Sequence, residues 1–239
     1  MLATYVASIC RIKEHSLNRM FQMPDEAVFS GQSNDNFELL KAWAGTTLAY
    51  AILRTGAGNL LTSTFVTNLL VSAVVCGLGF VLHELAHRVV ARGYGAQAHF
   101  VANNAWLLIS IVLAFTGFFI AAPGAVWHRG YLTTRQSGLI ALAGPATNLV
   151  LSALFFVALL AMIVAQIDVP DLVFVICAIG FSLNAWLGLF NMIPAGPFDG
   201  AKVLAWSPLV FGITVAIGIL LTFVLGSDSA IRAVLSVLT

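Results

Sequence analysis

The sequence predicts an all-α polytopic membrane protein of about five to six transmembrane helices, with a re-entrant or β-containing segment near residues 94–130. Two observations lead to this fold class. The chain is 60% hydrophobic and only 9% charged, whereas about a quarter of the residues in an average soluble domain are charged. Its apolar residues also come in long runs, several of which approach the roughly 20 residues that a helix needs to cross a bilayer.

The expected organisation is a cytoplasmic, partly irregular segment over residues 1–36, an intramembrane domain over 37–226 and a short tail over 227–239. Charged residues interrupt any early apolar run, so membrane insertion is expected to depend on internal spans. These residues are Arg11, Lys13, Glu14 and Arg19. The three cysteines are scattered, which indicates small buried side chains and no disulfide framework. A formal net charge of +1 gives no sign of a nucleic-acid partner, so the surroundings expected from composition are the lipid bilayer of a cell membrane.

Six apolar runs follow the N-terminal segment. They cover residues 37–53, 64–92, 105–126, 136–166, 172–190 and 207–225. The first run is short for a span and carries Lys41, whose long side chain can reach the membrane interface. The third run has the hydropathy of a span, but Gly117, Pro123 and Gly124 interrupt it. It is therefore not expected to cross the membrane as one regular helix.

The second run carries a motif of ionisable residues, His83-Glu84-Leu-Ala-His87. The two histidines are four residues apart, so on a helix both imidazoles lie on one face within reach of a single ion. Glu84 lies beside them. A metal-activated water with a carboxylate to accept its proton suits peptide-bond hydrolysis. The alternative is a polar cluster that is merely hydrogen-bonded. Because ionisable groups at membrane depth are costly and tend to mark function, we favour a site for one zinc ion per chain.

A catalytic zinc site with three protein ligands needs one more group. Among the later acidic residues, Asp168 and Asp171 lie in a predicted turn. Asp199 instead follows two prolines, in a segment that cannot be a regular helix and yet lies between two spans. Such backbone is tolerated at membrane depth where protein buries it or where it lines a wet cavity. We therefore expect Asp199 to be the third ligand; the alternative is that it only caps a short helix at 200–206.

A single ion can touch all three side chains only if two helix ends meet on one side of the membrane. The histidines lie near the C-terminal end of their helix, and Asp199 follows the C-terminal end of the run 172–190. The runs 136–166 and 172–190 supply two crossings, which satisfies the requirement. The segment 105–126 must then dip in and return, or otherwise end on the side where it began.

This number of membrane crossings also places most of the basic residues on one side of the membrane. They are Arg11, Lys13, Arg19, Arg88, Arg92, Arg129, Arg135 and Lys202, whereas Arg54 and Arg232 fall on the other side. The positive-inside rule makes the populated side cytoplasmic. The active site is therefore expected toward the cytoplasmic side of a multi-pass membrane protein. His99 and His128 flank the third run and are expected at the interface, away from the metal.

Two further motifs complete a pattern. Asn191-Met-Ile-Pro194-Ala-Gly-Pro197-Phe-Asp199-Gly200 leads into an Asp-Gly pair, and Gly144-Pro145-Ala-Thr-Asn148 precedes it. With His83-Glu-Leu-Ala-His87, these motifs resemble in order those of the site-2 protease family of intramembrane zinc metalloproteases, over about residues 64–206. The resemblance implies that His83, His87 and Asp199 ligate zinc and that Glu84 is the catalytic base. It also implies that Asn148 stabilises the reacting carbonyl or orients substrate; a buried amide that ties two spans together is the alternative.

The resemblance implies hydrolysis of peptide bonds within or near transmembrane segments of membrane-protein substrates. The sequence most resembles compact archaeal and bacterial members of the family, which lack PDZ and CBS modules. It departs from the family pattern at Ala201, where a second glycine often follows Asp-Gly. A substrate helix would have to unwind locally, and the unwound strand could pair with a strand edge in the 94–130 region. Asn184 could contact such a strand or could serve only helix packing.

Other functions are weighed against this one. A divalent-metal (zinc) transporter, or a metal-binding membrane protein without proteolytic activity, could also place His and Asp on spans. It gives no role to Glu84, and the sequence has no second polar cluster marking a path across the membrane. A membrane zinc endoprotease of another class would use a glutamate as third ligand, but Glu84 is the last glutamate in the chain.

Overall fold

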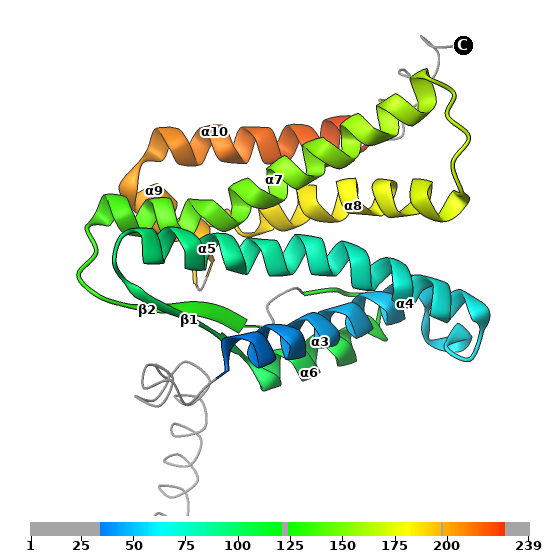
Figure 1. Cartoon of the computed structure of the whole chain (residues 1–239), viewed down its shortest axis with the longest axis horizontal. Coiled ribbons are helices and arrows are strands. Elements are labelled where there is room, and N and C mark those ends of the chain that lie inside the picture. Colours follow the sequence, from blue (N-terminus) through cyan, green and yellow to red (C-terminus); the bar gives the residue numbers. More distant parts are fainter. Residues whose placement is uncertain (1–33, 121–123, 197, 228–239) are drawn as a thin grey trace, which may run out of the picture. The chain divides into compact units, whose positions relative to one another are not determined.

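The computed structural model describes residues 34–120, 124–196 and 198–227. Nearly all of the expected N-terminal segment 1–36 and tail 227–239 lie outside these residues. The elements, in chain order, are α3 (Asp35–Thr55), η1 (Ala57–Asn59), α4 (Ser63–Cys76), η2 (Gly77–Val81), α5 (Leu82–Gly93), β1 (Gln97–Ala102), α6 (Asn104–Ala114), β2 (Gly124–Arg129), α7 (Thr134–Val164), α8 (Asp171–Phe190), α9 (Asp199–Trp206), α10 (Pro208–Ile219) and η3 (Leu220–Leu225) (Figure 1).

The predicted class, a mostly helical polytopic membrane protein, is confirmed. Within the described residues, four helices are long and apolar enough to cross a membrane: Ser63–Gly93, Thr134–Val164, Asp171–Phe190 and Pro208–Leu225. The expected number was five or six. The run 37–53 lies in α3, which has the length of a span but carries Glu38 and Lys41 near its start. In its described residues, the run 105–126 contains the short apolar helix α6 and the first residues of β2.

The chain between β1 and β2 leaves and returns to the same place. The two strands form an antiparallel sheet, in register from Gln97 opposite Arg129 to Ala102 opposite Gly124. α6 has 11 residues and lies between the strands in sequence. Because antiparallel neighbours run in opposite directions, the segment ends beside its starting point. This agrees with the expectation that residues 105–126 dip in and return.

The helix that carries the histidine motif is continuous from Ser63 to Gly93. Its middle, Gly77–Val81, is a five-residue π-helical stretch, a feature that often marks functional sites in helices. Two glycines allow close packing here. A Cβ at Gly77 would lie 2.9 Å from Nε1 of Trp43, and one at Gly79 would lie 2.9 Å from Oδ1 of Asn184. Both helix neighbours can therefore approach the turn immediately before the motif.

α7 lies at the centre of the helical packing, where it contacts α5, α8 and α9 (Figure 1). It begins with a capping box, in which Thr133 and Gln136 satisfy each other's backbone N–H groups. Gly138 faces Trp206 of α9, and a Cβ at Gly138 would overlap that indole. These contacts fix α9, and with it the Asp-Gly motif, against the start of α7.

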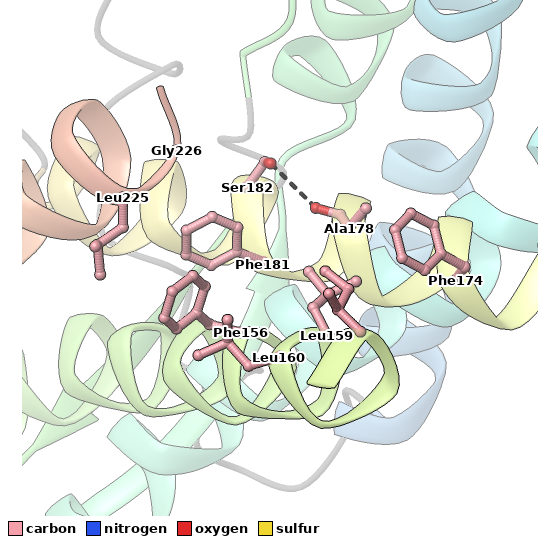
Figure 2. Close-up of a pocket in the computed structure, with 10 residues that line it drawn as sticks. Phe156, Leu159, Leu160, Phe174, Ala178, Phe181, Ser182, Leu225 and Gly226 are labelled. Carbon is pink, nitrogen blue, oxygen red and sulfur yellow. Dashed lines mark hydrogen bonds between the residues drawn. The ribbon is translucent and has the colours of Figure 1, made fainter. Parts of the chain in front are cut away.

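A separate apolar cavity of about 210 Å³ lies among α7, α8 and the end of η3. Figure 2 shows the rings of Phe156 and Phe181 and the side chain of Leu225 around it. The hydroxyl of Ser182 is already used, since it donates to the carbonyl of Ala178 at 3.0 Å (Figure 2). The lining has no titratable side chain, so this cavity offers no chemistry.

Candidate metal centre

Three side chains from two distant segments converge on one point. Nε2 of His83 and Nε2 of His87 lie 3.0 Å apart. Oδ2 of Asp199 lies 3.4 Å from the first and 3.2 Å from the second. Both histidines are buried, and the Asp199 side chain is only 14% exposed. Ligand atoms of the three residues all lie within 4.8 Å of one another, so one ion can contact all of them.

The donor set suits zinc, which binds imidazole nitrogen and carboxylate oxygen and in catalytic sites takes three protein ligands. The neighbouring backbone leaves space for the ion. Gly144 of α7 faces the two ring nitrogens, and a Cβ there would lie 2.5 Å from Nε2 of His83. A residue with any side chain would therefore crowd the position at which the ligands meet. The residues present fit a zinc ion.

Asp199 is the first residue of α9 and is directed to the histidines instead of capping its helix. The N-cap of α9 is Phe198, and no side-chain cap hydrogen bond is formed there. The backbone N–H of Gly200 donates to Asn191 at 2.8 Å, and a Cβ at Gly200 would overlap the carbonyl of Met192. This close approach fixes the start of α9. Burial alone would raise the pKa of Asp199, but the adjacent imidazoles hold it below the usual range of a carboxyl group, which favours the anionic form that a metal needs.

Each imidazole is oriented by a second hydrogen bond on its other nitrogen. Nδ1 of His87 lies 2.7 Å from the carbonyl oxygen of Ile140, and Nδ1 of His83 lies 2.5 Å from Oδ1 of Asn148. Both partners are acceptors, so both Nδ1 atoms carry the proton. Each Nε2 then presents its lone pair to the metal, as is usual for histidine ligands.

Asn148 is fully buried, and its amide is used on both sides. Besides accepting from His83, it donates to the carbonyl of Gly79 at 2.8 Å and to Oδ1 of Asn184 at 2.9 Å. Its contacts are therefore with a ligand and with two neighbouring helices. This geometry favours the buried-amide alternative, with the added role of orienting His83, over a direct contact with the reacting carbonyl.

A polar cavity of about 90 Å³ lies beside the three groups. Glu84 lines it together with His83, His87 and Asp199, so the motif carboxylate is within the same small space as the metal-binding atoms. Asn191, His128 and Lys202 also line this cavity. Lys202 is near enough to act electrostatically on Glu84, His87 and His128.

His128 was expected at the membrane interface, away from the metal, and this prediction is wrong, because His128 lines the cavity beside the metal-binding atoms. The position of Lys202 in this cavity was not predicted. Lys202 follows Asp199 by three residues in α9, and this spacing on one helix face was a signal that could have located it. His128 came with no such signal, because its place depends on the strand pairing. Burial, Lys202 and His87 together lower the pKa of His128, which favours the neutral ring. His99, by contrast, lies 3.0 Å from Asp35.

The two edges of the hairpin differ. Groups of β1 that point away from β2 are occupied: Arg92 donates to the carbonyl of Ala98 at 2.7 Å, and the N–H of Ala102 donates to Glu38 at 3.0 Å. In an antiparallel pair, the residues opposite such outward-pointing positions also point outward. These are His128 and Gly124 of β2, with Val126 between them. All three line the polar cavity, so the outer edge of β2 borders the metal centre.

Asp35 anchors the end of the motif helix. Its carboxylate accepts from Arg88 at 3.0 Å and from Arg92 at 3.3 Å, and its other oxygen contacts Nδ1 of His99. The start of α3 is thus joined to the last two turns of α5 and to β1. The pairs with Arg88 and His99 are partly buried, and this limits screening by water and salt.

Comparisons with known proteins agree with this centre. A zinc metalloprotease of Methanocaldococcus jannaschii, provisionally named MJ0611, is 42% identical over 146 residues, which cover 60% of this chain and 74% of the relative. The chain belongs to the site-2 protease family of zinc metalloproteases. Two further relatives with provisional zinc metalloprotease names are Rip3 of Mycobacterium tuberculosis, 34% identical over 55% of this chain and 29% of the relative, and YwhC of Bacillus subtilis, 32% identical over 53% and 64%. No family model and no solved structure match the chain. Zinc is therefore the cofactor of this site-2 protease, and His83, His87 and Asp199 form a group that can hold it.

Proposed function

We propose that this site-2 protease hydrolyses peptide bonds within or near transmembrane segments of membrane-protein substrates, by regulated intramembrane proteolysis. The observation that carries the proposal is the position of the cavity. His83, Glu84 and His87 lie in Ser63–Gly93, a helix long and apolar enough to cross a membrane, and Glu84 is buried beside the metal-binding atoms. A hydrolytic centre on such a helix suits a substrate that is itself in the membrane.

The proposed chemistry divides into a metal part and a protein part. When bound, zinc supplies a Lewis acid that polarises a carbonyl and makes water acidic enough to attack near neutral pH. His83, His87 and Asp199 hold the ion. Glu84 accepts the proton of the attacking water and delivers it to the leaving amine. Lys202, His128 and Asn191 line the cavity and carry N–H groups that can donate to the charge that develops on the carbonyl oxygen.

The substrate must present an extended strand, because in a helix each peptide group is shielded within its own hydrogen-bond ladder. We propose that the unwound segment adds to the outer edge of β2, by strand addition. Two observations support β2 over β1: Arg92 and Glu38 already occupy the outer edge of β1, and Gly124, Val126 and His128 border the cavity. A strand paired there would pass beside Glu84.

Glu84→Gln is the direct test of the reaction. In proteoliposomes with a membrane-spanning substrate, we expect cleavage to fall roughly a hundred- to ten-thousand-fold, with zinc content unchanged because Glu84 is not a ligand. Retained cleavage would overturn the assignment. Zinc flux into the same vesicles that survives Glu84→Gln would instead favour the divalent-metal transporter, which the names of the relatives do not favour.

The orientation of the site is also proposed, from the distribution of Lys and Arg: the metal centre faces the cytoplasm. Single cysteines at two exposed positions test it, with the native cysteines replaced by alanine. Arg135→Cys lies at the start of α7 and Asp168→Cys lies beyond its end. In intact cells we expect an impermeant maleimide to label only Asp168→Cys; labelling of Arg135→Cys alone would reverse the orientation.

A further inference from the structure

A chain of hydrogen bonds extends behind His83, away from the cavity. Nδ2 of Asn184 donates to the carbonyl of Gly180 at 2.8 Å, and Oδ1 of Asn184 accepts from Nδ2 of Asn148 at 2.9 Å. Asn148 also donates to the carbonyl of Gly79 and accepts from Nδ1 of His83 at 2.5 Å. Asn148 and Asn184 are both fully buried, so water does not compete for these contacts.

The direction of this chain follows from its backbone partners. A backbone carbonyl can only accept a hydrogen bond, so the carbonyl of Gly180 must face the NH₂ group of Asn184. The side-chain oxygen of Asn184 then faces Asn148. The oxygen of Asn184 and the carbonyl of Gly79 are both acceptors, so both must face the NH₂ group of Asn148. The oxygen of Asn148 is then the group that meets His83. Only the tautomer with the proton on Nδ1 satisfies this arrangement.

The two histidines are held by different means. His87 donates directly to the backbone carbonyl of Ile140 in α7. No other side chain takes part in this hydrogen bond. His83 depends on two side chains, and the second of them lies on α8. Gly79 is part of the arrangement, since a Cβ there would lie 2.9 Å from the oxygen of Asn184. The glycine in the π-helical stretch thus permits α8 to reach the motif helix.

We propose that Asn184 is a positioning residue of the metal centre. It touches neither the metal-binding atoms nor the cavity, and it acts through Asn148 to fix the tautomer and ring orientation of His83. The inference rests on the metal centre of the proposed function and is independent of the substrate. A partner bonded directly to a metal-binding histidine, as Asn148 is here, is worth roughly 10- to 100-fold in metal affinity, and Asn184 acts on that partner.

The variant that tests it is Asn184→Leu, which keeps the size of the side chain and removes both hydrogen-bonding groups. Its matched control is Ser152→Ala. Ser152 is also fully buried and joins the same two helices, since its hydroxyl donates to the carbonyl of Phe181 at 2.9 Å, but none of its contacts leads to His83. Zinc affinity of the purified full chain is measured by competition with a chelator, without any substrate.

We expect Asn184→Leu to weaken zinc binding roughly three- to tenfold, less than the loss of a partner bonded directly to the ligand, and Ser152→Ala to change it less than twofold. Unchanged affinity in Asn184→Leu, or an equal loss in both variants, would overturn the proposal. A second measurement does not depend on the variant folding: ¹⁵N NMR of histidine-labelled, zinc-free wild-type protein should show His83 with its proton on Nδ1, and a proton on Nε2 would contradict the proposal. Because neither readout involves cleavage, a failed protease assay and a failed positioning role remain distinguishable.

Discussion

Oδ2 of Asp199 lies 3.2 Å from Nε2 of His87, although two long helices, α7 and α8, separate the two residues in sequence. Their meeting requires that the ends of α5 and α8 lie together. The return of the chain through the β1–β2 hairpin and the antiparallel pair α7 and α8 supply this arrangement. The metal centre is thus a consequence of the topology as much as of the motifs.

Gly144 is expected to be needed for the space in which the ligands meet. In Gly144→Ala, the added Cβ would lie 2.5 Å from Nε2 of His83, so the ring must move out of position. We expect zinc affinity to fall at least roughly tenfold. Gly212→Ala in α10 is the matched control, because a Cβ there meets nothing within 4 Å. Chelator competition on both variants checks this expectation, and equal affinities would show that the ligands do not meet beside Gly144.

The outer edge of β2 can be tested with Val126→Pro. Val126 points its N–H away from β1, as the pairing with Phe100 implies, so proline removes a donor from that edge and leaves the hairpin ladder intact. We expect cleavage to slow roughly three- to tenfold, with unchanged zinc affinity. Val126→Ala keeps the N–H and serves as control. If both variants cleave at the wild-type rate, the substrate does not pair at this position.

The charge on Lys202 is expected to matter for the reaction and not for the metal. Lys202→Met should keep zinc content and lower kcat by roughly ten- to a hundredfold, since one donor to the developing charge is lost. Lys202→Arg retains a cation and should keep most of the activity. Steady-state kinetics on a soluble peptide or a reconstituted substrate separates kcat from KM. A change confined to KM would assign Lys202 to substrate binding alone.

Asp35 is expected to stabilise the site from outside the cavity. Asp35→Asn keeps the size of the side chain but removes the charge that pairs with Arg88 and Arg92. We expect a loss of about 1–3 kcal/mol in the free energy of unfolding, visible as a lower midpoint of thermal unfolding in detergent. Asp168→Asn, at an exposed position between α7 and α8, should leave the midpoint unchanged. A midpoint equally unaffected in Asp35→Asn would mean that these ion pairs are screened.

Much of the fold could be predicted from the sequence because its strongest signals are local. Apolar runs are long enough to identify the spans over 136–166 and 172–190, and two histidines four residues apart identify one face of a helix. The position of Asp199 followed from two further constraints. The prolines before it exclude a regular helix there, and an even number of membrane crossings places it on the same side of the membrane as the histidines. Interrupting residues within 105–126 indicated that this segment would return.

The remaining features depend on packing between elements and had no local signal. Asn184 is an ordinary polar residue in an apolar run until α8 is placed against the π-helical stretch of the motif helix. His128 faces the cavity only because the register of β2 against β1 puts it opposite Ala98. Asn148 belongs to a motif that marks the site, yet its role depends on which neighbours take its two amide protons. Sequence patterns placed Asn148 near the site and His128 away from it, and they left the contacts of Asn148, Asn184 and His128 undetermined.

The zinc content of the purified chain most directly tests whether His83, His87 and Asp199 bind one metal ion together. Wild-type protein, Asp199→Ala and the control Asp168→Ala would be dialysed against a zinc buffer and analysed for metal per chain. We expect one zinc ion per chain in the wild type and in Asp168→Ala, and a large loss of zinc in Asp199→Ala at the same free zinc concentration. Full zinc content in Asp199→Ala, or none in the wild type, would contradict a site held by His83, His87 and Asp199.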